Sequence, residues 1–262
     1  MYNMEFRQYL ENQNLAETTI NAHMRNIKKI AKVGLSQKLM VKKLNEYPTW
    51  GTRLSAANTL SKYLVFKNQP NEEIVAYIHE ANQEIQKEAT KRQKDMALDD
   101  TLPSLKEMKA HMNSLFQIGD YRGYAIMYLF LTYTVRNADL IGKVVKSKKL
   151  SNETENFFIV GRKRVIYLRN KYKTAEKYGT KSHVITNPKF HTAISKLDYL
   201  LKPTDNIDRV VKKITADIGH ITEGTIAKII LRENDSINGL KRMSNNRGTD
   251  ISTLINSYNI TK

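Results

Sequence analysis

One arginine closes the most apolar run of this basic chain. The run extends from Tyr124 to Val135, Arg136 follows it directly, and Asp139 stands three residues later. A guanidinium fixed at the edge of a core can donate two hydrogen bonds to a phosphate, and it stays charged at physiological pH. The spacing therefore indicates either a phosphate-holding arginine or an ordinary surface arginine after a core helix.

The charge balance favours a polyanionic partner. The 262 residues include 43 Lys and Arg against 26 Asp and Glu, a formal net charge of +17. Nucleic acid is the first candidate for such a chain, and an anionic membrane surface is the competitor. No segment approaches the roughly 20 continuous apolar residues of a membrane-spanning helix. We therefore expect a nucleic-acid partner and no membrane partner.

Cysteine is absent, and the six histidines are scattered without the spacing of metal ligands. The sequence therefore predicts no disulfide, no thiolate metal site and no bound metal. Its first residues, MYNMEFRQYLENQ, lack the charged and apolar regions of a signal peptide. We expect a cytoplasmic, DNA-associated protein.

Apolar residues at helical spacing dominate the first third of the chain. They predict two helices within residues 2–32, a third over 36–46, and further helices that begin near Thr49 and Pro70. The almost wholly polar stretch QKEATKRQKDMALDD, residues 86–100, then predicts a helical tail and an exposed linker. We expect a small all-helical domain over residues 1–98.

The remaining residues, 99–262, predict a second, mainly helical domain. Ser104 is placed to cap its first helix, and the apolar run follows. Three short β-prone runs, near 156–160, 164–168 and 182–186, predict a small three-stranded antiparallel sheet. Helices resume after Pro188. The fold class is therefore mainly α, and two basic domains joined by a linker would suit a clamp around duplex DNA.

Four segments, in order, resemble the tyrosine recombinases, or phage-type integrases. FRQYLENQNLAETTINAHMRNIKKI is similar to that family's helical core-binding domain, and LTYTVRNADLIGKV to the segment that carries its first catalytic arginine. YKTAEKYGTKSHVI resembles the hairpin that carries a catalytic lysine, and ISTLINSYNI the segment with the nucleophilic tyrosine. The resemblance implies a phage or mobile-element protein that cuts and rejoins DNA.

The resemblance assigns a role to several residues. Arg136, with Asp139 beside it, matches the first arginine, Lys173 the lysine and Tyr258 the nucleophile. A tyrosine can attack a backbone phosphorus and hold the cut strand as a phosphotyrosine, so no cofactor is needed. Guanidinium groups would stabilise the charged transition state, and the lysine would protonate the leaving oxygen.

The sequence departs from the family pattern before the tyrosine. His220 matches the histidine of a His-x-x-Arg motif, but its arginine position holds Glu223, whose carboxylate would repel a phosphate. The family's His or Trp some nine residues before the tyrosine is also missing, and Arg247 is the nearest cation that could substitute. Each lost donor typically costs about 10²–10³ in rate.

These departures favour a catalytically impaired regulator, such as a repressor, that binds specific double-stranded DNA. The alternative is an active recombinase that uses Tyr258, Arg136, Lys173 and Arg247. A third interpretation is a basic protein that binds RNA or packages nucleic acid without specificity. A homo-oligomer on DNA is left open. The candidate DNA contacts are Arg25, Lys28, Lys29, Arg53, Lys62, Arg136, Lys171, Lys173, Lys177, Lys181, Arg242 and Arg247.

Overall fold

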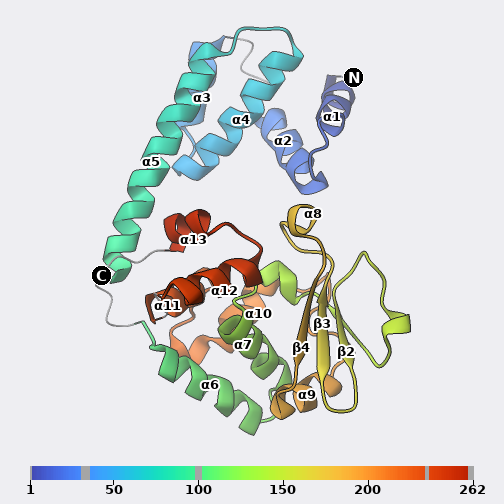
Figure 1. Ribbon diagram of the computed structural model, residues 1–262. Helices are drawn as coiled ribbons and strands as arrows, with labels where there is room; N and C mark the ends of the chain where they lie inside the picture. The colour runs from blue at the N-terminus through green and yellow to red at the C-terminus, as the bar shows by residue number, and fades with distance from the viewer. Residues whose placement is uncertain (1, 31–35, 98–101, 234–235, 259–262) are drawn as a thin grey trace. The chain divides into compact units, whose positions relative to one another are not determined.

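The computed structural model describes residues 2–30, 36–97, 102–233 and 236–258 (Figure 1). Its contacts divide the chain into two compact units, Met1–Arg92 and Gln93–Lys262. The boundary predicted near residue 98 lies outside the described residues. Each unit has a hydrophobic core of its own.

The first unit is helical, as the apolar spacing predicts. Its helices are α1 (Tyr2–Glu11), α2 (Glu17–Ile30), α3 (Gln37–Asn45), α4 (Trp50–Phe66) and α5 (Glu72–Ala97), the last of which continues beyond Arg92. Helix α4 begins at a capping box, in which the Thr49 hydroxyl accepts a hydrogen bond from the Thr52 amide at 3.2 Å. Fully buried side chains from α1, α2 and α4 form the centre of the core, among them Phe6, Leu10, Ile27, Leu60 and Leu64.

The second unit is built around α7 (Tyr121–Tyr133), whose residues are buried almost all round. Such a helix is hydrophobic on every face because other elements cover it on every side. It packs against α6 (Leu105–Gln117), α9 (Pro188–Ser195) and α11 (Glu223–Glu233). The other helices are α8 (Ala175–Tyr178), α10 (Ile207–Ile214), α12 (Ile237–Arg247) and α13 (Ile251–Tyr258).

A four-stranded sheet completes this unit, in the order β1 (Lys143–Val145), β2 (Phe157–Val160), β3 (Val165–Arg169) and β4 (Lys181–Ile185). The predicted three-stranded antiparallel sheet was incomplete: β2, β3 and β4 pair antiparallel, but β1 adds a parallel edge strand. A strand of three residues is too short to show alternation in the sequence. Its pairing with β2 is a product of the tertiary fold.

No helix within the described ranges has an apolar stretch long enough to cross a bilayer. The residues of the candidate site lie at or next to the ends of elements in the second unit. These places are the turn after α7, the C-terminus of α12, the loop between β3 and β4, and the first residue of α11.

Candidate functional site: an arginine cluster at the end of helix α12

The turn after α7 fixes Arg136 at the edge of the core. Thr134 ends the helix in the left-handed conformation (φ 49°), and its amide still bonds back to the Phe130 carbonyl at 2.9 Å. Arg136 then precedes a short 3₁₀ helix, Asn137–Leu140, and its amide donates to Asp139 Oδ2 at 3.0 Å. The Arg136 side chain is half-buried.

Asp139 is fully buried and pairs with an arginine that the sequence analysis did not single out. Arg169, at the end of β3, is also fully buried and donates from Nη2 to Asp139 Oδ2. Burial raises the pKa of Asp139, and the charge of Arg169 and the amide of Arg136 oppose that rise. The Tyr167 hydroxyl also donates to the Asp139 carbonyl at 2.5 Å. These contacts fix the 3₁₀ turn against β3.

Arg247 is the second buried arginine, with 1% of the residue exposed. Its Nη1 donates to the Thr134 carbonyl at 2.9 Å, and its Nη2 lies 2.5 Å from Glu223 Oε1. We call Arg136, Asp139, Arg169, Glu223 and Arg247 the arginine cluster. Three guanidinium groups and two carboxylates leave the cluster with one formal positive charge in excess. Such an excess suits a single bound phosphodiester.

The C-terminus of α12 draws these cations together. Its last three carbonyls each accept from one cationic side chain: Asn245 from Lys181, Asn246 from Arg169 at 2.6 Å, and Arg247 from Arg136 at 2.6 Å. The last carbonyls of a helix have no partner within the helix, and they carry the negative end of its dipole. The C-terminus of α12 therefore binds positively charged side chains from three other segments.

The loop between β3 and β4 and the first residue of β4 carry the remaining predicted lysines of this unit. Lys171 and Lys173 are exposed. Lys177 pairs with Asp250 Oδ2 at 3.2 Å, and Lys181 is held at the Asn245 carbonyl. Burial lowers the pKa of Lys181, and the positive charge of Arg169 lowers it further.

Three further residues predicted for the site are His220, Tyr258 and Arg242. His220 is exposed with φ 53°; its Nδ1 lies 3.1 Å from the Lys212 carbonyl oxygen, and its amide donates to the Thr215 carbonyl at 2.8 Å. Tyr258 is the last residue of α13, and its side chain lies outside the described part of the structure. Arg242 is exposed on α12.

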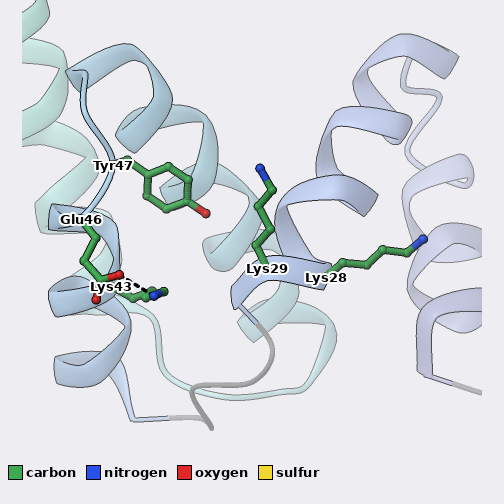
Figure 2. Close-up of a pocket in the computed structure, with 5 residues that line it drawn as sticks. All are labelled: Lys28, Lys29, Lys43, Glu46 and Tyr47. Atoms are coloured by element: carbon green, nitrogen blue, oxygen red, sulfur yellow. Dashed lines mark hydrogen bonds and ion pairs between the residues drawn. The ribbon is translucent and has the colours of Figure 1, made fainter.

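In the first unit, the predicted DNA contacts on α2 are Arg25, Lys28 and Lys29, and all three are exposed. Lys28 and Lys29 lie in the last turn of that helix, next to a hollow of about 450 Å³ that is also lined by Lys43, Glu46 and Tyr47 (Figure 2). In this view the Lys29 ammonium and the Tyr47 hydroxyl point into the same space, whereas Lys43 pairs with Glu46.

The other two predicted contacts in this unit make internal bonds. Arg53 donates from Nε to the Tyr47 carbonyl at 2.9 Å and lies 4.6 Å from the centre of the Trp50 ring. Lys62 donates to Gln13 Oε1 at 2.7 Å. Arg53 therefore helps to pack the start of α4, and Lys62 links α4 to the turn that follows α1.

Sequence reasoning missed Arg169, although a signal for it exists. In β3 the inward positions alternate, so Val165, Tyr167 and Arg169 share the buried face. An arginine at an inward strand position requires a buried acceptor, and the carboxylate of Asp139 supplies it. Among the described residues there is no group of three or more His, Cys, Asp or Glu side chains that could hold a metal ion.

No protein-family model matches the chain. No curated protein matches it either. Among solved structures, the crystal structure of XerA recombinase aligns with 100% of this chain and 94% of its own length, at 12% sequence identity and a TM-score of 0.39. The likeness is distant, so the functional proposals below rest on the contacts of the chain's own residues.

Proposed function

We propose that this protein is a sequence-specific double-stranded DNA-binding regulator whose arginine cluster holds a backbone phosphate without cutting the strand. The observation that carries the proposal is the engagement of Arg247: the guanidinium is buried and bonded to the Glu223 carboxylate and the Thr134 carbonyl. A cation already neutralised by a fixed carboxylate gives little extra stabilisation to a developing phosphorane charge.

Arg136 is the half-buried arginine of the cluster, and we assign it the phosphate contact. One of its terminal nitrogens donates to the Arg247 carbonyl at 2.6 Å, which fixes the direction of the side chain. A guanidinium carries its N–H donors in a planar fork that matches the oxygens of a phosphate. The exposed lysines Lys171 and Lys173 add charge on the same unit. In the first unit, Arg25, Lys28 and Lys29 would contact other phosphates.

One observation supports the alternative, an active recombinase. Arg136 and Arg247 are 111 positions apart in sequence, yet the side chain of one donates to the backbone of the other. Both side chains also act on the charge of the buried Asp139 carboxylate, and transfer of a DNA strand to a tyrosine would require two arginines near one phosphate. In the alternative, the Arg247 guanidinium would have to leave the Glu223 carboxylate and bind the DNA phosphate.

The test begins with selection of a binding site from a pool of duplexes with a randomised central segment. The selected duplex, nicked beside the candidate cleavage position to trap a covalent product, is then mixed with wild-type protein and with Tyr258→Phe. We expect both proteins to bind with equal affinity and neither to form a covalent adduct. An adduct with the wild type alone would establish the recombinase instead. Failure to enrich any sequence, with equal competition by RNA, would support the non-specific interpretation.

A further inference from the structure

The loop between β3 and β4 is fastened to the turn between α12 and α13 by three side-chain contacts. Thr174 Oγ1 donates to the Gly248 carbonyl at 2.6 Å, Lys177 Nζ lies 3.2 Å from Asp250 Oδ2, and the Tyr178 hydroxyl donates to Asp250 Oδ1 at 2.9 Å. We call these contacts the clasp. Asp250 is its centre, because each of its two carboxylate oxygens takes one loop side chain.

The backbone fits closely at the same place. Gly248 has φ +60°, and a Cβ on it would lie 2.9 Å from both Thr174 Oγ1 and Tyr172 Cε2. Tyr172 closes the loop on itself by donating its hydroxyl to the Gly179 carbonyl at 2.6 Å. The loop therefore packs against the turn in a defined conformation, and Asp250 binds the C-terminal half of the loop.

The charges of the clasp are exposed to solvent. The side chains of Lys177 and Asp250 are 63% and 59% exposed. The bonds from Tyr178 and Lys177 lower the pKa of Asp250, and the bond to Asp250 raises the pKa of Lys177. Both groups are therefore charged across the physiological range, and a phosphate could reach the exposed Lys177 ammonium.

The loop that Asp250 holds carries Lys171, Lys173 and Lys177 within seven residues. We propose that Asp250 is a positioning residue that competes with DNA phosphate for Lys177 and so limits how strongly the loop engages the duplex. This inference rests on the DNA binding proposed above. A phosphate that takes Lys177 from Asp250 removes one of the two side chains bonded to that carboxylate.

The competition links the loop to α13. Asp250 immediately precedes this helix, and its carbonyl accepts from the Leu254 amide at 3.0 Å. Apart from the clasp, α13 is anchored by Leu254, which packs in a small cluster with Ala227, Leu231 and Met243. Release of Lys177 therefore loosens an attachment at the start of the helix that ends at Tyr258.

The test compares Asp250→Asn with Asp217→Asn, which makes the same charge change at an exposed residue outside the clasp. Affinity for a 30-base-pair duplex of mixed sequence is measured from about 50 to 300 mM salt. We expect Asp250→Asn to bind about 2- to 5-fold more tightly than Asp217→Asn at the lowest salt. Its plot of log affinity against log salt should be steeper by about 0.9, the value for one added phosphate contact.

Amide hydrogen exchange on the free proteins gives a second readout that needs no DNA. Residues 171–180 should exchange faster in Asp250→Asn than in the wild type and Asp217→Asn. Equal affinities and equal salt slopes in the two variants would overturn the inference while leaving the proposed function intact. Failure of the wild type to bind the duplex at any salt concentration would overturn both.

Discussion

Arg247 and Glu223 form a pair in which one charge is buried and the other half-buried: Nη2 lies 2.5 Å from Oε1, and the side chains are 1% and 18% exposed. The pair joins the last residue of α12 to the first residue of α11. A buried guanidinium needs a nearby carboxylate because its desolvation costs several kcal/mol. Glu223, which departs from the recombinase pattern, therefore has a structural role as the counter-ion of Arg247.

Replacement of Glu223 by Gln should destabilise the second unit and strengthen phosphate binding. The buried charge of Arg247 loses its counter-ion, so we expect the free energy of unfolding to fall by about 2–3 kcal/mol. The charge excess of the arginine cluster rises by one, so affinity for duplex DNA should increase at low salt. Urea denaturation and DNA titration measure the two effects. Glu153→Gln, at an exposed loop residue, is the matched control; a response equal to the control's would contradict this account.

The Arg169–Asp139 pair gives a second prediction. Arg169→Met leaves the fully buried Asp139 carboxylate without its partner, and we expect a loss of about 3–5 kcal/mol in the free energy of unfolding. Adding Asp139→Asn to Arg169→Met should restore part of that loss, because no charge then remains unpaired. A double-mutant cycle on urea midpoints measures the coupling. Strictly additive losses would mean that the two side chains are held independently.

Gly248→Ala should loosen the contact between the β3–β4 loop and α12. The position has φ +60°, and the added Cβ would meet two loop atoms at 2.9 Å. We expect a loss of about 1–3 kcal/mol and earlier proteolytic cleavage within residues 171–180. Gly51→Ala is the matched control, because nothing lies within 4 Å of its Cβ position in α4. That change should stabilise the first unit by about 0.5–1 kcal/mol.

The burial of His183 predicts that the free energy of unfolding depends on pH. Burial lowers its pKa to about 4, and the positive charges of Arg169 and Lys181 contribute. Its ring lies 4.6 Å from that of Tyr133, and its Nε2 has no partner among the described residues. In the unfolded chain this histidine takes up a proton near pH 6.5, and in the folded chain it does not. The contribution of His183 to the free energy of unfolding is therefore fully present above pH 6.5 and is lost as the pH falls toward 4.

The size of that loss should be on the order of 2–3 kcal/mol between pH 6.5 and 4. Urea unfolding at a series of pH values measures it, and His183→Gln should flatten the curve. The His183 ring proton resonances should not titrate until about pH 4. A midpoint near 6.5 for this ring would show that it is open to water.

Local sequence patterns predicted most of the elements. Period-3.6 spacing located most helices of both units, because the buried face of each helix recurs at that interval, but it did not predict the four-residue helix α8. Short β-prone runs between polar turns located β2, β3 and β4 to within one residue. The parallel strand β1 was missed, because three residues carry no detectable period and its partner lies across a separate loop.

The sequence by itself determined the charge excess, the helical character, and the position of Arg136 after an apolar helix. Only the tertiary structure decided which charges meet. Arg169, Glu223 and Arg247 are separated by tens of residues, and their pairing depends on where β3, α11 and α12 end in space. The physical reason is that a buried charge is stable only beside a partner. That partner is supplied by whichever carboxylate or helix-end carbonyl the packed core brings within hydrogen-bond distance.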